Sequence, residues 1–161
     1  MRAYADADWA NDPIQRKSTT GYIVFFNGAP VSWHSGLQGT ISLSSCEAEY
    51  VALSECCREV DYLRSILDFV QHPADGPTEV FEDNQGTIDL ASNPVHHKRT
   101  KHVEVKYHYV RDAQDKGRVR VVKVHTTLNH ADIMTKATDQ KTFTRHVSMI
   151  MVERRAPRHP T

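Results

Sequence analysis

The chain has 161 residues, of which 39% are hydrophobic, enough for one folded domain with an apolar core. The 20 Lys and Arg residues balance the 20 Asp and Glu residues, so the overall charge does not indicate nucleic-acid binding, and such a site requires local clustering. The three cysteines form no CxxC pair and no apolar run is long enough to span a bilayer, so we expect an intracellular, soluble chain in a reducing compartment, with no membrane partner.

The first part of the chain predicts three antiparallel strands. Residues 2–6 form a short strand, and the β-branched and aromatic residues of segment 20–26 form a second strand. Asn27 and Gly28 are typical of a hairpin turn, so residues 29–35 form the return strand.

A long helix is predicted from residue 45 to residue 70. Ser44 and Glu47 match the capping box that starts such a helix. The apolar stripe along it consists of Cys56, Val60, Leu63 and Leu67. Extending this stripe toward the N-terminus reaches Glu49, an acid where an apolar residue is expected.

The second half predicts parallel strands alternating with helices. Residues 78–82 form a strand that ends just before Asp83, and Asn84 can cap a helix over residues 85–92. The remaining elements are a helix over residues 100–115, a strand over 118–124 and a short helix over 129–136 that carries Asp132. The pattern decays beyond about Lys141, so we expect an α/β domain over residues 1–140 and a poorly ordered basic tail over residues 141–161.

Four acids occupy positions that suggest chemistry: Asp6, Glu49, Asp83 and Asp132. Carboxylates that converge repel one another unless divalent cations neutralise them, and this favours metal-dependent phosphodiester chemistry. Alternatives exist for each acid. Asp8 shares a strand face with Asp6, Glu49 can be a rim residue, Asp83 can cap the next helix, and Asp132 can be a solvated helix residue.

The order of these elements and seven short segments resembles the ribonuclease H domain of copia-type LTR retrotransposon polyproteins. The segments occur in the family's order and cover nearly everything from Tyr4 to Lys136. They are Ala5–Ala10, Lys17–Tyr22, Ala29–Trp33, Leu43–Tyr50, Glu82–Gln85, Lys98–His102 and Ala131–Lys136. The resemblance implies an α/β, ribonuclease H-like fold with a mixed five-stranded sheet, three antiparallel strands followed by two parallel ones, flanked by helices.

The same resemblance implies an activity and its partners. Asp6, Glu49 and Asp83 would be catalytic metal ligands, and Asp132 the fourth. Two Mg²⁺ ions, with Mn²⁺ as a substitute, would act on the RNA strand of an RNA–DNA hybrid. The expected partner domain is the reverse transcriptase of the parent polyprotein. The expected location is a cytoplasmic virus-like particle, with the nucleus as the alternative.

A basic stretch over residues 96–123 supplies the local asymmetry that the net charge hides. We expect a nucleic-acid-binding surface there, although a solvated helix face is an equal alternative. The candidate binding residues are Lys98, Arg99, Lys101, Lys106 and, beside Asp83, Asn84.

Three departures from the family pattern support a second function. His125 and Ala137 stand where the family is expected to have proline, and Met1 precedes Asp6 by only a few residues. These features fit a fragment separated from its polymerase. The alternative is therefore a catalytically silent nucleic-acid-binding remnant of a retrotransposon polyprotein.

Overall fold

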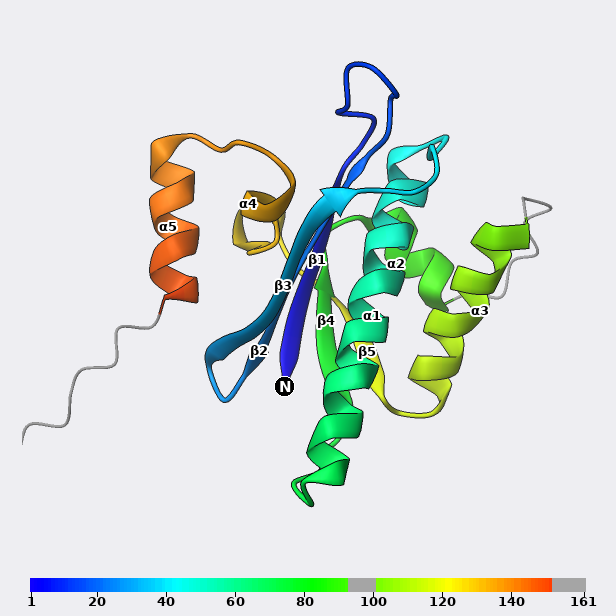
Figure 1. The fold of residues 1–161 in the computed structure, drawn as a ribbon, viewed down its shortest axis with the longest axis vertical. Helices are drawn as coiled ribbons and strands as arrows, with labels where there is room; N and C mark the ends of the chain where they lie inside the picture. Colours follow the sequence, from blue (N-terminus) through cyan, green and yellow to red (C-terminus); the bar gives the residue numbers. More distant parts are fainter. Residues whose placement is uncertain (93–100, 152–161) are drawn as a thin grey trace, which may run out of the picture.

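A five-stranded mixed sheet forms the centre of the molecule, with helices against both of its faces (Figure 1). The computed structural model describes residues 1–92 and 101–151. The strands are β1 (Arg2–Asp8), β2 (Thr19–Phe26), β3 (Ala29–Leu37), β4 (Thr78–Glu82) and β5 (Val119–Lys123). The helices are α1 (Ser45–Phe69), α2 (Gln85–Ser92), α3 (Lys101–Asp115), the 3-10 turn η1 (Thr126–Leu128), α4 (Asp132–Thr135) and α5 (Gln140–Ile150).

The strands lie in the order β3-β2-β1-β4-β5. β2 pairs antiparallel with both β1 and β3, whereas β4 pairs parallel with both β1 and β5. The predicted sheet of three antiparallel strands followed by two parallel strands is confirmed. Because β1 and β4 are parallel neighbours, their carboxyl ends lie at the same end of the sheet.

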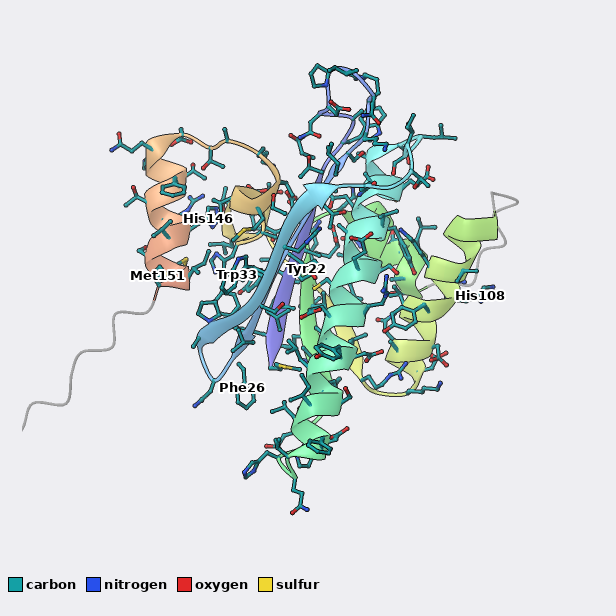
Figure 2. The ribbon with its side chains drawn as sticks, viewed as in Figure 1. Tyr22, Phe26, Trp33, His108, His146 and Met151 are labelled. Carbon is teal, nitrogen blue, oxygen red and sulfur yellow. The ribbon has the colours of Figure 1, made fainter. Side chains whose placement is uncertain are left out.

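A tight turn joins β2 to β3, as its sequence predicts. Asn27 and Gly28 have φ values of 50° and 82°, the left-handed conformation that a two-residue hairpin turn requires. β3 is an edge strand of the sheet, and Trp33 on it is 63% exposed (Figure 2).

The sheet separates two apolar cores. Successive β1 side chains point to opposite faces, so Ala3 and Ala5 pack on the α1 side while Tyr4 packs on the other side. The first core also contains Val24, Leu53, Cys56, Val60 and Val80. The second core, under α4 and α5, contains Tyr4, Ile23, Phe25, Ala131 and Ile150.

The long helix α1 begins where the capping residues predict. The Ser44 hydroxyl accepts a hydrogen bond from the Glu47 backbone N–H at 3.2 Å, and the Glu47 carboxylate accepts one from the Leu43 N–H at 2.8 Å. These bonds satisfy donors at the start of the helix, where no intrahelical partner exists. Figure 1 shows that this start lies at the end of the sheet where β1 finishes.

The C-terminal region differs from its prediction. The sequence pattern predicts no element beyond about Lys141, but residues 140–150 form helix α5. The Asp139 carboxylate caps this helix by accepting a hydrogen bond from the Thr142 N–H at 3.0 Å. His146 and Ile150, four residues apart on one stripe, are buried against the rest of the molecule. A capping aspartate and a narrow stripe of buried side chains are enough for a helix here, although polar residues dominate the segment. The remainder of the predicted tail, residues 152–161, lies outside the described residues, and the domain boundary at residue 140 stays a prediction.

Candidate active site

Three of the four predicted acids meet at one end of the sheet. Asp6 lies near the end of β1, Asp83 follows β4 directly, and Glu49 lies near the start of α1. Each offers one oxygen, and these three oxygens lie within 4.8 Å of one another. Asp8 is not in this set, so the structure favours Asp6 between the two alternatives that the sequence left open.

The acid cluster is defined as Asp6, Glu49 and Asp83, of which the first two are buried and Asp83 is partly exposed. Asp6 is 2% exposed and Glu49 is 8% exposed. Burial raises the pKa of Asp6 to about 6, against the hydrogen bond from Thr135 and the charge of Lys136, which lower the pKa. Burial, and then the charges of neighbouring carboxylates, raise the pKa of Glu49 far above its usual value. Among the described residues, Glu49 Oε2 has no hydrogen-bond partner.

Glu82 is a further buried acid that the sequence analysis missed. It is fully buried, and its Oε1 atom accepts a hydrogen bond from the Asn84 N–H at 2.9 Å. Burial raises the pKa of Glu82 well above its usual value, and its charge also raises the pKa of Glu49. The two-residue period of β4 was the available signal, because Thr78, Val80 and Glu82 all lie on its buried face.

Asp132 lies beside Asp6 but outside the acid cluster. The Lys136 ammonium group stands near both carboxylates, 2.9 Å from Asp132 Oδ1 and 3.9 Å from Asp6 Oδ2. The Thr135 hydroxyl donates a hydrogen bond to Asp6 Oδ2. Partial burial lowers the pKa of Lys136, but the nearby carboxylates outweigh this effect and raise the pKa, so Lys136 is charged. The sequence analysis assigned no role to Thr135 or Lys136.

Gly21 explains why α4 can lie so close to Asp6. Gly21 pairs directly with Asp6 across the β1–β2 ladder. A Cβ atom at this position would lie 2.6 Å from Thr135 Cγ2 and 2.8 Å from Met134 Cβ, distances that side chains do not tolerate. The absence of a side chain at Gly21 therefore lets α4 bring Asp132 and Thr135 to the site.

A buried glutamine fixes the start of α1 relative to β2. The Gln38 amide group donates to Ala48 O at 2.9 Å and to Thr20 Oγ1 at 3.1 Å, and its Oε1 atom accepts from the Ser42 hydroxyl at 2.9 Å. Because Ala48 directly precedes Glu49, these bonds hold the helical turn that carries Glu49. Fully satisfied buried networks of this kind restrict a site to one arrangement.

The residues predicted to bind nucleic acid are only partly described. Lys98 and Arg99 lie outside the described residues, and of Lys101 only the backbone is described. Lys106 forms an ion pair with Glu55 at 3.7 Å, and Asn84 accepts a hydrogen bond from the Thr87 N–H at 3.2 Å at the start of α2. Their role in binding stays a prediction.

A second set of buried ionisable side chains, the histidine pair of His130 and His146, lies where α5 meets Tyr4 and Phe25 of the sheet. His130 is 6% exposed and His146, on α5, is fully buried (Figure 2). Their Nδ1 atoms lie 3.1 Å apart, a distance at which one ring donates a hydrogen bond to the other. Burial and then the charges of His146, Arg2 and Arg145 lower the pKa of His130 to about 4, so both rings are neutral near pH 7. Tyr4 and Phe25 surround His130.

His125 has a local structural role. Its ring nitrogen accepts a hydrogen bond from the Thr127 N–H at 3.3 Å, which caps the turn η1.

In the described part of the chain, no helix is both long and apolar enough to cross a membrane.

Comparison with known proteins identifies relatives by sequence and by structure. No protein-family model matches the chain. The retrovirus-related Pol polyprotein from transposon TNT 1-94 of Nicotiana tabacum is 40% identical over 144 residues. This match covers 89% of the chain but 11% of the polyprotein, so the chain spans only about a tenth of the length of this relative.

Solved structures with the same fold are ribonucleases H. The crystal structure of RNase H1 from the archaeon Halobacterium salinarum NRC-1 has a TM-score of 0.59 at 19% identity and covers 83% of this chain and 92% of that one. LC11-RNase H1, solved in complex with an RNA/DNA hybrid, has a TM-score of 0.59 at 16% identity, covering 83% of this chain and 91% of that one. These likenesses show that the fold is ribonuclease H-like.

Proposed function

Because this chain is homologous to one segment of the retrovirus-related Pol polyproteins of copia-type transposons and has a ribonuclease H-like fold, we propose that it hydrolyses the RNA strand of RNA–DNA hybrids. One observation carries the proposal. The fold gathers Asp6, Glu49 and Asp83 from separate parts of the chain to within 4.8 Å of one another at one end of the sheet. Like charges so close together have no structural benefit of their own.

The acid cluster fits divalent metal ions. It offers oxygen atoms alone, and Mg²⁺ prefers such ligands, with Mn²⁺ as a substitute. Among the described residues, the buried Glu49 Oε2 atom has no hydrogen bond, so an atom of the cluster is left for a cation to satisfy. Asp6, Glu49 and Asp83 would hold one ion, and Asp6 and Asp132 the second.

When bound, such ions neutralise the charge of a scissile phosphate and lower the pKa of an attacking water. The protein residues supply position. The Thr135 hydroxyl holds Asp6 through Oδ2, and the Gln38 network holds the turn that carries Glu49. The side chains that would bind metal therefore need little rearrangement, which is how a preorganised site lowers the barrier to reaction.

The substrate assignment rests on two supports. The relative with 40% identity is a transposon Pol polyprotein, and the neighbour LC11-RNase H1 was crystallised with an RNA/DNA hybrid. Contacts to the 2′-hydroxyl groups in the minor groove would select the RNA strand, because DNA lacks these groups. In the parent polyprotein the partner would be the reverse transcriptase, which produces such hybrids.

A cleavage assay tests the proposal. Purified protein with Mg²⁺ should cut an end-labelled RNA strand when it is hybridised to DNA, and Asp83→Asn should lower the rate by about 10³-fold or more, or roughly 4 kcal/mol. Asp8→Asn is the matched control, because Asp8 lies on the same strand face as Asp6 but outside the acid cluster. Calcium should support binding but little turnover, because its coordination is less strict.

Three results would contradict the proposal: activity of the Asp83→Asn variant, cleavage of duplex DNA in place of the hybrid, and equal rates with calcium and magnesium. Hybrid binding without cleavage under all metal conditions would instead favour the silent nucleic-acid-binding remnant.

A further inference from the structure

The Lys136 side chain lies next to Asp6 and Asp132, the two acids that would hold the second metal ion. Its ammonium nitrogen is 2.9 Å from Asp132 Oδ1 and 3.9 Å from Asp6 Oδ2. Both carboxylates are buried, whereas the Lys136 side chain is 40% exposed and reaches them from the protein surface. The ammonium group thus already supplies a positive charge to this pair of carboxylates.

Two contacts hold Lys136 at this place. Its backbone N–H donates to Asp132 O at 3.3 Å at the end of α4, and the preceding residue, Thr135, donates its hydroxyl hydrogen to Asp6. The backbone of Lys136 is therefore held close to both acids, while its flexible side chain can still turn toward solvent.

The acid cluster differs from this pair. Within the described residues, no ion pair forms with Glu49 or Asp83. A divalent ion can therefore join Asp6, Glu49 and Asp83 without displacing a protein cation that pairs with Glu49 or Asp83. A second ion held by Asp6 and Asp132 would compete for carboxylates that already face the ammonium group, and the two cations would repel each other.

Resting on the proposed function, we propose that Lys136 competes with the second divalent ion for Asp6 and Asp132. The chain without nucleic acid then holds one ion at the acid cluster, and the second ion binds only when the ammonium group has moved away. Lys136 is in this sense a positioning residue that controls how many metal ions the site holds.

Counting bound Mn²⁺ tests this inference without any measurement of cleavage. Free Mn²⁺ is followed by electron paramagnetic resonance as it is titrated into the folded protein without nucleic acid. The wild-type chain should bind one ion tightly. Lys136→Gln and Lys136→Met should each raise the affinity for the second ion by about tenfold or more, because the competing charge is gone. Lys136→Arg, which keeps the charge, should resemble the wild type.

Lys141→Gln is the matched control, because Lys141 is an exposed lysine on α5 and its loss changes the net charge equally. It should leave both Mn²⁺ affinities unchanged. Circular dichroism shows which variants are folded, and Lys136→Met keeps the length of the apolar stem if Lys136→Gln does not fold.

The outcomes separate this inference from the proposed function. If the wild type binds one ion and neither neutral variant strengthens the second, the role of Lys136 is wrong while the acid cluster stands. An equal gain in Lys141→Gln also overturns the inference, because net charge alone would explain it. If no protein in the series binds Mn²⁺, the metal site itself is wrong and the inference is overturned with it.

Discussion

The acid cluster and the histidine pair under α5 are both buried ionisable groups, and burial moves both toward their neutral forms. Burial raises the pKa of Asp6 to about 6 and lowers the pKa of His130 to about 4. The neighbours differ. His130 and His146 share a hydrogen bond at 3.1 Å, whereas Asp6 lies within 4.8 Å of two further carboxylates that compete for the same protons and cations.

A displaced pKa therefore does not distinguish a functional residue from a structural one. Nor does a buried atom without a hydrogen-bond partner, because among the described residues both Glu49 Oε2 and His146 Nε2 lack one. The distinction lies in whether the neighbouring groups suit the neutral form or are like charges that raise the cost of ionisation. The two histidines form a neutral pair between aromatic side chains, so we assign them to stability. The three acids have oxygens within 4.8 Å of one another and repel when ionised, so we assign them to cation binding.

Glu49→Gln should show the largest effect, a loss of hybrid cleavage of about 10³-fold, or roughly 4 kcal/mol. The amide keeps the shape of the side chain but is a weaker metal ligand. Burial and the neighbouring carboxylates already hold Glu49 in its neutral form without metal, so the neutral amide should leave the metal-free Tm equal or higher. Single-turnover cleavage and thermal unfolding of the same preparation check both points. Parallel losses of activity and stability would show that Glu49 is structural, as we infer for the histidines.

Asp6→Asn should remove a change of roughly 3 kcal/mol in the free energy of unfolding that accompanies the ionisation of Asp6. The carboxyl group of Asp6 ionises near pH 3.8 when unfolded and near pH 6 when folded, so Asp6 lowers the stability as pH rises through this interval. His130 acts oppositely, because its folded pKa of about 4 lies below the ordinary 6.5 and it adds stability as pH rises. These two contributions have opposite signs and similar size, and the Asn substitution removes only the first.

The metal-free Asp6→Asn variant should therefore gain stability relative to the wild type between pH 4 and about pH 6.5. Urea unfolding at stepped pH measures this difference. Parallel curves for the two proteins would mean that Asp6 ionises normally in the folded state. The sign is informative, because a stabilising ion pair at Asp6 would make the variant lose stability instead.

Gly21→Ala should destabilise the protein by about 2 kcal/mol and reduce cleavage, because its Cβ would push α4 away from Asp6. Gly39→Ala is the control. A Cβ atom at Gly39 meets nothing within 4 Å, so this change should stay within about 0.5 kcal/mol of the wild type. Chemical denaturation of both variants checks the prediction, and equal effects would contradict the role of Gly21.

His146→Phe should show the smallest effect, a destabilisation of about 1 kcal/mol with cleavage within about twofold of the wild type. The ring remains, but His130 Nδ1 loses its partner. Denaturation and cleavage rates measured together test this. A large loss of cleavage at unchanged stability would place α5 in substrate binding and contradict our assignment of the histidines.

Local patterns were sufficient for most of the fold. The Asn27–Gly28 turn, the Ser44 cap and the boundaries of β4 and α2 depend on neighbouring residues, and the structure has them where the sequence predicts. Helix α5 was missed because its burial comes from distant residues, while its own composition is mostly polar. Tertiary contacts determine such elements, and local propensity does not reveal them.

The site was predictable only in part for the same reason. Asp6, Glu49 and Asp83 each violate a local apolar pattern, and this marks them in the sequence. Lys136 violates no such pattern, because a lysine after a short helix is ordinary, and only the fold brings it to Asp6. Glu82 could have been found from the period of β4, because it shares the buried face of that strand with Thr78 and Val80.

Hydrogen bonds between the first strand and the C-terminal part of the domain have a consequence for synthesis on the ribosome. The Asn129 amide donates to Ala5 O at 2.8 Å, and Thr135 donates to Asp6, contacts that span 124 and 129 residues. Such distant pairings form late, because a long loop must close before they contribute. We therefore expect Asp6 to reach its final surroundings only after nearly the whole domain has emerged from the ribosome.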